Sequence, residues 1–323
     1  MLYISEKTIN TIGIDWGAAT DAIFKATEAL RRNEFSQPVK PYLRYKNPKN
    51  RIIAMPAYLG GEFEVAGIKW ISSFPENLDK NIKRAHSVII LNEEDTGRPL
   101  SVINTPIVSG IRTSAVTGAL IRKCFEVNPP EKKLNFGIIG FGPIGQLHLQ
   151  MINALFGDLI EKVRIYDLRS IDESKIPEDI KSKVEITKGW EEVYNNSDVF
   201  ITCTVSAASY IGEQPPKGSL QLNVSLRDYK TNIVDYIDKM VVDDWDEICR
   251  ENTDVENMHK EQGLKKEDTI NISEALIGDG LNNVGKDDVI MFNPMGMAIF
   301  DMAIGKMFYE KAKSTGEGVA LED

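Results

Sequence analysis

The sequence has few of the residues that build metal centres and disulfide frameworks. It contains 323 residues but three cysteines and three histidines. The cysteines, at positions 124, 203 and 249, are far apart and lack Cys-x-x-Cys spacing, so neither disulfides nor a structural zinc is expected. Unpaired cysteines fit a reducing compartment, and we expect the protein in the cytoplasm. The histidines show no ligand spacing, and we expect no metal.

Positive charge and long apolar runs are also scarce. Lysine and arginine number 38 against 48 aspartates and glutamates, a net charge of −10. No run of basic residues exceeds two, so a nucleic-acid partner or an anionic membrane surface is not expected. No stretch approaches the roughly 18 apolar residues of a membrane span, and the first residues lack the apolar core of a signal peptide.

The first part of the chain has the pattern of an α+β domain. Apolar residues recur at helical spacing from Trp16 to Arg32, and prolines at 38, 41 and 48 then exclude a long helix. Strand-like runs follow at 51–55, 65–71, 87–92 and 99–104. This spacing predicts a mainly antiparallel sheet.

A different pattern begins after the proline-containing segment 128–133. Strand-like runs at 135–139, 163–167, 184–187, 199–204, 220–224 and 240–243 alternate with helical or loop segments. Such alternation is typical of βαβ units, so the sequence predicts a doubly wound, Rossmann-type parallel sheet. A terminal helix is expected from about residue 293 to Gly316.

A glycine-rich turn follows the first strand of this second pattern. Gly140, Gly142 and Gly145 form a G-x-G-x-x-G motif, with Pro143 and Ile144 inside it, between a buried strand and a helix-compatible run. The first glycine permits the tight turn, the second lets a pyrophosphate approach the backbone, and the third allows close packing of helix and strand. The helix N-terminus supplies N–H groups for the anion. We therefore expect a dinucleotide site here.

Asp167 ends the next strand, where an acid can accept hydrogen bonds from the ribose hydroxyls of adenosine. Its charge would repel a 2′-phosphate, which favours NAD over NADP, although Arg169 lies two residues on. Later strand ends on the same edge carry Thr204, Val205 and Ser225. These could line the nicotinamide ribose, but hydroxyl residues after a strand are also ordinary turn residues.

Two cations have apolar surroundings in the first domain. Lys69 lies within the strand 66–71, and Arg112 follows an apolar stretch. Each either extends its charged end to water or meets a buried anion, and for any single residue the former is more common.

Several separated motifs resemble one known family. Segments 54–56, 67–70 and 111–116, the glycine turn and segment 294–301 are similar to the ornithine cyclodeaminase and mu-crystallin family. The resemblance implies an α/β protein with a substrate-binding and dimerisation domain at 1–115 plus 293–323 and an NAD-binding Rossmann domain at 116–292. It also implies a homodimer formed through the first domain.

The resemblance implies roles for individual residues as well. Substrate carboxylates fall to Arg44, Lys69 and Arg112, with Arg51 a weaker candidate. The catalytic residues are Asp228, as acid and base, and Lys69. Further cofactor contacts fall to Thr113 and Met297.

Within the family, segments 37–44, 51–56, 241–245 and 293–299 are most similar to members that oxidise N-(2-amino-2-carboxyethyl)-L-glutamate with NAD. That reaction gives an imine and, after hydrolysis, 2,3-diaminopropionate, a siderophore precursor, and 2-oxoglutarate. Ornithine cyclodeaminases carry an acid before the Met-Pro pair to hold the substrate amine, where this chain has Ile53. Ornithine cyclisation, another amino-acid or imine dehydrogenation, and a non-catalytic nicotinamide-binding protein remain alternatives.

Overall fold

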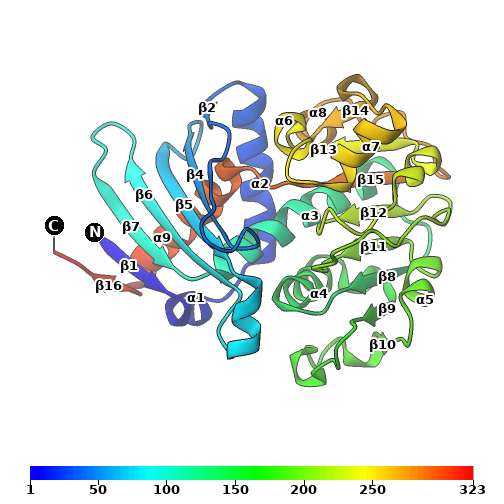
Figure 1. Cartoon of the computed structure of the whole chain (residues 1–323). Coiled ribbons are helices and arrows are strands. Elements are labelled where there is room, and N and C mark those ends of the chain that lie inside the picture. Colours follow the sequence, from blue (N-terminus) through cyan, green and yellow to red (C-terminus); the bar gives the residue numbers. More distant parts are fainter. Residues whose placement is uncertain (323) are drawn as a thin grey trace. The chain divides into compact units, whose positions relative to one another are not determined.

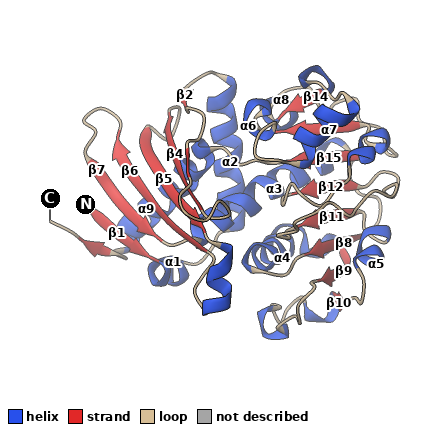
Figure 2. Ribbon diagram, viewed as in Figure 1, coloured by secondary structure: helices blue, strands red, loops and turns tan. Residues whose placement is uncertain are grey.

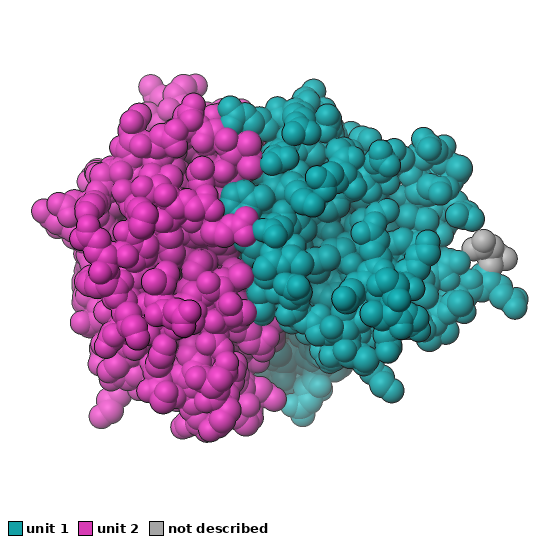
Figure 3. Space-filling view, turned by 180° about the vertical axis from the view of Figure 1, so that it is seen from behind, with its two compact units in different colours: residues 1–115, 297–323 teal, residues 116–296 magenta. Residues whose placement is uncertain are grey.

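The computed structural model describes residues 1–322, and the chain divides into two compact units (Figures 1 and 3). Unit 1 comprises Met1–Ala115 together with the C-terminal residues from Met297, and unit 2 comprises Val116–Gly296. The first boundary lies within the long helix α3 (Ile107–Val127). No helix among residues 1–322 has both the length and the hydropathy that a membrane span requires.

Unit 1 is built on a mixed sheet. Its strands lie in the order β16-β1-β7-β6-β5-β4-β2, and β3 pairs with β4. Neighbours are antiparallel except β1 and β7, which run parallel. The strands are β1 (Leu2–Ser5), β2 (Phe35–Ser36), β3 (Tyr42–Leu43), β4 (Arg51–Leu59), β5 (Val65–Ser73), β6 (Ala85–Glu93), β7 (Pro99–Asn104) and β16 (Val319–Ala320).

One face of this sheet is covered by helix α9 (Ala298–Thr315), which contacts β4, β5 and β6 and also α1 (Glu6–Ile12) and α2 (Trp16–Arg31). A short 3-10 helix, η1 (Pro75–Lys80), connects β5 and β6. The approach of α9 is close at Gly67, where an added Cβ would lie 2.8 Å from the Met302 sulfur. Glycine in the middle of β5 therefore leaves room for the helix.

The predicted helix at the start of the chain is confirmed, and so are the four predicted strands, as β4 to β7. The short strands β1 and β16 were not predicted. Each is held by pairing with a partner far along the chain, Leu2 with Ser101 and with Ala320, and local periodicity carries no such information.

Unit 2 is a doubly wound α/β unit with a fully parallel sheet (Figure 2). Its order is β10-β9-β8-β11-β12-β15-β13-β14. The order reverses between β8 and β11, and ligands of such sheets bind where the order reverses. The strands are β8 (Leu134–Ile139), β9 (Ile160–Tyr166), β10 (Val184–Ile186), β11 (Val199–Thr202), β12 (Leu220–Asn223), β13 (Lys239–Val242), β14 (Thr269–Asn271) and β15 (Ile290–Asn293).

Helices connect these strands, and buried Tyr194, Phe200 and Tyr229 form part of the core beneath them. The helices are α4 (Pro143–Phe156), α5 (Trp190–Asn195), α6 (Trp245–Ile248), α7 (Asp254–Gln262) and α8 (Ile272–Leu276). The 3-10 helices are η2 (Gly157–Leu159), η3 (Glu173–Lys175), η4 (Lys181–Lys183), η5 (Thr231–Tyr236) and η6 (Lys266–Asp268).

The predicted doubly wound sheet is thus confirmed, with two strands more than the sequence pattern indicated. Strand β15 inserts between β12 and β13, and β14 forms the edge. Residues 290–293, where the terminal helix was expected to begin, belong to β15, and α9 begins later, at Ala298. The three apolar residues Ile290 to Phe292 are too short a run for periodicity to separate strand from helix.

Candidate functional site

The glycine turn lies between β8 and α4, at the reversal of strand order in unit 2. Gly140 has a φ of +87°, and a Cβ there would lie 2.6 Å from the Cys203 carbonyl oxygen. A Cβ on Gly145 would lie 2.1 Å from the Gly140 carbonyl oxygen. Both positions therefore require glycine to let the turn close and the helix approach the strand.

Gly142 is different because no atom of residues 1–322 occupies the space beside it. A Cβ at this position would meet no atom within 4 Å. Gly142 is also the N-cap of α4, where no side chain accepts a hydrogen bond and Pro143 opens the helix. The N–H groups of the first turn, including those of Ile144 and Gly145, have no intrahelical partner and form a favourable place for an anion. The turn thus fits the pyrophosphate of a dinucleotide.

Asp167 is held against the same turn. Its Oδ2 accepts a hydrogen bond from the Phe141 N–H at 2.8 Å, and its Oδ1 accepts one from the Arg169 N–H at 2.9 Å. The Arg169 guanidinium lies 3.6 Å from Oδ1 but is largely exposed, so this pair is weak. The carboxylate is therefore fixed at the end of β9, where a ribose can reach it.

A second polar cluster of unit 2 surrounds Asp228, which is fully buried. The Thr204 hydroxyl donates to Asp228 Oδ1 at 2.5 Å, and Ser225 Oγ forms a hydrogen bond with Asp228 Oδ2. Ser225 Oγ also lies 2.8 Å from the Thr202 hydroxyl. Two residues predicted to line the nicotinamide ribose, Thr204 and Ser225, are thus brought onto the predicted catalytic carboxylate.

Two further groups beside Asp228, the Tyr210 phenol and the Cys203 thiol, are neutral. Burial, reinforced by Asp228 itself, raises the pKa values of the Tyr210 phenol and the Cys203 thiol far above neutrality. Both groups therefore stay protonated and add no second negative charge beside Asp228. Val205, also predicted to touch the cofactor, is 66% exposed.

A third cluster lies in unit 1 and surrounds Lys69. Its side chain belongs to a row of residues that runs across the sheet. Met55 of β4 is its neighbour on one side and Ile89 of β6 on the other, and Ile103 of β7 and Ile4 of β1 continue the row after Ile89. All five side chains are buried. A lysine in such a row cannot extend its ammonium group to water, and it needs a buried partner.

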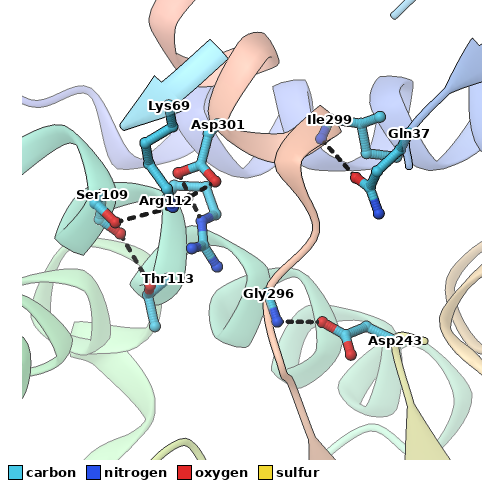
Figure 4. Close-up of polar contacts among 9 residues, drawn as sticks. All are labelled: Gln37, Lys69, Ser109, Arg112, Thr113, Asp243, Gly296, Ile299 and Asp301. Carbon is cyan, nitrogen blue, oxygen red and sulfur yellow. Dashed lines mark hydrogen bonds and ion pairs between the residues drawn. The ribbon is translucent and has the colours of Figure 1, made fainter. Parts of the chain in front are cut away.

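Asp301 of α9 is that partner (Figure 4). Lys69 Nζ donates to Asp301 Oδ2 at 2.7 Å, and Arg112 Nε donates to Oδ1 at 3.0 Å. Lys69 Nζ also lies 3.3 Å from the Ser109 hydroxyl. One fully buried carboxylate therefore holds the two predicted substrate-binding cations, Lys69 and Arg112.

The environment also changes the acidity of Lys69. Burial lowers its pKa to about 7, and although Asp301 opposes this shift, Arg112 and Lys40 add to it. Lys40 is itself buried, with 3% of its surface exposed. Sequence analysis had not singled out Lys40 or Asp301. The available signal for Asp301 was an acid in the first turn of a helix whose neighbours are almost all apolar.

Arg44 and Arg51 both lie against the Tyr42 ring, with their Cζ atoms 5.4 and 5.7 Å from its centroid. Arg44 also donates to the Pro48 carbonyl oxygen at 3.1 Å. Strand alternation places Arg51, Ile53 and Met55 on one face of β4, and Met55 pairs with Lys69. The register therefore places Arg51 and Lys69 on the same face of the sheet.

Thr113 and Met297 were predicted to contact the cofactor. The Thr113 hydroxyl donates to the Ser109 carbonyl oxygen at 2.9 Å, one turn back in α3. Met297 is the N-cap of α9 and is buried. The residues before it are fixed by Asp243, whose Oδ1 accepts the Met295 N–H at 2.9 Å. Its Oδ2 accepts the Gly296 N–H at 2.6 Å (Figure 4).

Residues 1–322 contain no group of three or more histidine, cysteine, aspartate or glutamate side chains placed to hold a metal ion.

Comparison with known proteins identifies the family. The model of the ornithine cyclodeaminase/mu-crystallin family matches residues 8–316. The chain belongs to this family. Among curated members, it is 35% identical over 344 residues to N-((2S)-2-amino-2-carboxyethyl)-L-glutamate dehydrogenase of Staphylococcus aureus, with 99% of this chain and 98% of the relative covered. It is 25% identical over 330 residues to alanine dehydrogenase of Archaeoglobus fulgidus, with 99% and 98% covered.

Solved structures of the family share the fold. The Δ1-pyrroline-2-carboxylate reductase of Thermococcus litoralis, in complex with NADH and L-proline, has a TM-score of 0.89 at 22% identity, with 99% of this chain and 100% of that chain covered. An archaeal alanine dehydrogenase dimer with bound NAD has a TM-score of 0.85 at 24% identity, with 100% and 99% covered.

Proposed function

We propose that this member of the family is an NAD-dependent dehydrogenase that oxidatively cleaves N-(2-amino-2-carboxyethyl)-L-glutamate. The substrate, NAD⁺ and water give 2,3-diaminopropionate, 2-oxoglutarate, NADH and a proton, and the diaminopropionate would supply siderophore synthesis. The observation that carries the proposal is the Lys69–Asp301–Arg112 cluster, together with Arg51 on the same sheet face.

Unit 2 would hold NAD. The pyrophosphate would lie against Gly142 and the N-terminus of α4, and Asp167 would accept the ribose hydroxyls. The open space beside Gly142 and the uncapped helix end support this assignment. When bound, the nicotinamide supplies a two-electron acceptor for oxidation of the substrate carbon.

Unit 1 would hold the substrate carboxylates. Two cations share a single carboxylate in the buried cluster, so with Lys69 protonated the cluster carries an excess positive charge that an anion can neutralise. Arg44 and Arg51 supply planar guanidinium groups for a further carboxylate. The glutamyl half of the substrate carries two carboxylates, which is why several cations favour it over an amino acid with one.

Asp228 would accept and donate the proton that the reaction moves. Oxidation of the glutamyl α-carbon gives an imine at the secondary amine, and water adds to that imine before the carbon–nitrogen bond breaks. The Asp228 carboxylate accepts the proton from the amine or from the water and returns it to the leaving amine. Thr204 and Ser225 orient both of its oxygens, so Asp228 presents a fixed acceptor.

Oxidation or reduction of a smaller amino acid or cyclic imine is the second candidate. It is supported by the similarity to an alanine dehydrogenase and to pyrroline-2-carboxylate reductases. Ornithine cyclisation is less well supported, because Ile53 pairs with Tyr42 and Ile71 in the sheet and supplies no acid for a side-chain amine. A non-catalytic nicotinamide-binding protein would not need the oriented Asp228 carboxylate.

We also propose a homodimer, formed through the face of the unit 1 sheet opposite α9. This face carries Trp70, which is 43% exposed, and the partly buried Ile68, Val88 and Ile90. A second copy would cover them, as an apolar exposed sheet face requires. Sedimentation of wild type and Trp70→Glu tests this, since the variant should be monomeric.

The cytoplasm remains the expected compartment.

The test of the activity is NADH formation by the purified protein with N-(2-amino-2-carboxyethyl)-L-glutamate, with ornithine and alanine in parallel and with NADP in place of NAD. Turnover with the first substrate, yielding 2-oxoglutarate, supports the proposal. Turnover with alanine alone would support the second candidate. Proline and ammonia from ornithine would instead show a cyclodeaminase.

A further inference from the structure

Asp254, the first residue of α7, contacts the backbone of the loop that carries Asp228. It is buried, with 1% of its surface exposed. Its Oδ2 accepts the backbone N–H groups of Asp228 at 3.0 Å and Tyr229 at 3.1 Å. Neither oxygen of Asp228 is used in these contacts, so Asp254 holds the backbone of Asp228 and leaves its carboxylate to Thr204 and Ser225.

The same carboxylate is tied to the strand before the loop. Asn223, the last residue of β12, donates from Nδ2 to Asp254 Oδ2 at 3.1 Å, and its Oδ1 accepts the Leu226 N–H at 3.0 Å. The Asp254 N–H in turn donates to the Leu226 carbonyl oxygen at 2.9 Å. The segment 224–229, here termed the Asp228 loop, is thus fastened to Asp254 at Leu226 in its middle and at Asp228 and Tyr229 at its end.

The loop needs such support because its backbone is strained. Leu226 has a φ of +60°, a left-handed conformation that is strained for a leucine. Both polar backbone groups of Leu226 are satisfied by the Asn223–Asp254 pair. This turn directs residue 228 back towards Thr204, which follows the neighbouring strand β11.

A carboxylate at this buried position is itself unfavourable. Burial raises the pKa of Asp254 to about 6, and the negative charge of Asp228 adds to the shift, while the hydrogen bonds from Tyr229, Asn223 and Asp228 oppose it. The hydrogen bonds donated by Asp228, Tyr229 and Asn223 therefore offset part of the cost of burying the Asp254 carboxylate, which couples this side chain to the loop.

We propose that Asp254 is a positioning residue for the reaction: by holding the backbone of the Asp228 loop, it aims the Asp228 carboxylate and so sets the turnover rate. The inference rests on the proposed function, in which Asp228 moves the proton. Asp254 acts through Asp228, and its own oxygens are occupied by the loop, Asn223 and the Ser209 hydroxyl at 3.3 Å.

Two substitutions distinguish the effect of the hydrogen bonds that Asp254 accepts from the effect of its negative charge. In Asp254→Asn the amide oxygen can still accept the backbone N–H groups, and the amide nitrogen can donate to Ser209 Oγ. Asp254→Ala removes every one of these contacts. We expect Asp254→Ala to lower kcat about 10- to 100-fold through misplacement of Asp228, with the NADH dissociation constant unchanged, and Asp254→Asn to restore most of kcat.

The matched control is Asp198→Ala. Asp198 also accepts a backbone N–H, that of Asn135 at 2.8 Å. It precedes β11 and so lies at the amino ends of the strands, whereas the Asp228 loop follows their carboxyl ends. The Asp198→Ala substitution should lower the free energy of unfolding without changing kcat. If Asp254→Ala does not fold, Asn223→Ala serves instead, because it releases Leu226 and one contact of Asp254 and should also lower kcat.

Hydrogen exchange of segment 224–230 provides a readout that needs no substrate. The amides of Asp228 and Tyr229 should exchange faster in Asp254→Ala and at the wild-type rate in Asp254→Asn. Unchanged exchange, or a wild-type kcat in folded Asp254→Ala, contradicts the inference. Absence of turnover in the wild type would contradict the proposed function instead, and exchange would still decide whether Asp254 holds the loop.

Discussion

Asp301 Oδ2 accepts a hydrogen bond from Lys69 Nζ at 2.7 Å, although 232 residues separate the two along the chain. The exposed pair of Lys25 and Glu62 has the same length. The two pairs differ in burial, since the side chains of Lys69 and Asp301 are almost completely inaccessible and those of Lys25 and Glu62 are more than half exposed. Because the two pairs have the same N–O distance in different surroundings, their contributions to the free energy of unfolding can be compared directly.

Asp301→Asn should destabilise the protein strongly. The substitution leaves Lys69 and Arg112 buried without an anion, and loss of one member of a buried pair costs about 3–5 kcal/mol. Chemical denaturation measures the free energy of unfolding. Glu62→Gln is the control and should leave it near the wild-type value because water screens that pair. Equal effects of the two substitutions would show that the Lys69 ammonium is not dependent on Asp301.

Substrate capture should weaken as the pH rises past neutrality. In the proposed function Lys69 binds a carboxylate as the ammonium form, and with a pKa of about 7 it loses its proton above that pH. We therefore expect kcat/KM to fall about tenfold per pH unit above this value. In Lys69→Arg the charge persists and the fall should disappear. A kcat/KM that rises through the same range would instead indicate that neutral Lys69 acts as a base.

The glycines of the turn should separate folding from cofactor binding. In Gly145→Ala the new Cβ meets the Gly140 carbonyl oxygen, so the turn must rearrange and both the melting temperature and NADH affinity should fall. In Gly142→Ala the methyl group meets no protein atom, and the backbone, with φ of −72°, suits alanine. Here stability should be retained and NADH affinity lost. Calorimetry and NADH fluorescence distinguish the two, and undiminished NADH affinity in Gly142→Ala would place the pyrophosphate elsewhere.

Asp167→Asn should change the choice of cofactor. The substitution removes the charge that repels a 2′-phosphate and frees the Arg169 guanidinium, now 3.6 Å from Asp167, to bind that phosphate. Loss of charged hydrogen bonds to ribose should reduce kcat/KM for NAD about 10- to 100-fold. Steady-state kinetics with NAD and NADP checks this. An unchanged ratio of the two would mean that Asp167 supports the turn through Phe141 without contacting the ribose.

Patterns local in sequence accounted for the elements that position these sites. The strand, glycine turn and helix around Gly140 follow from residue types within a short segment, and so does the alternation of β4 to β7. The strand β15 was not predicted, because its place between β12 and β13 is set by long-range pairing.

The partner of Lys69 lay beyond such patterns for the same reason. An apolar strand with one lysine indicates two outcomes, an exposed charged end or a buried anion, and the sequence does not choose between them. The choice is made by α9, which brings Asp301 to the sheet. Likewise, hydroxyl residues after β11 and β12 were predicted to line a ribose, and the structure shows that Thr204 and Ser225 bind Asp228.

The most direct test of the proposed function compares wild type with Asp228→Asn in the oxidation of N-(2-amino-2-carboxyethyl)-L-glutamate by NAD. Asparagine has nearly the same shape and keeps contacts with Thr204 and Ser225, but it cannot accept the proton. We predict that the wild type forms NADH and 2-oxoglutarate in equal amounts, and that Asp228→Asn binds NADH normally with turnover reduced about 100- to 10,000-fold. Turnover of Asp228→Asn at the wild-type rate, or no NADH from the wild type, would contradict the account.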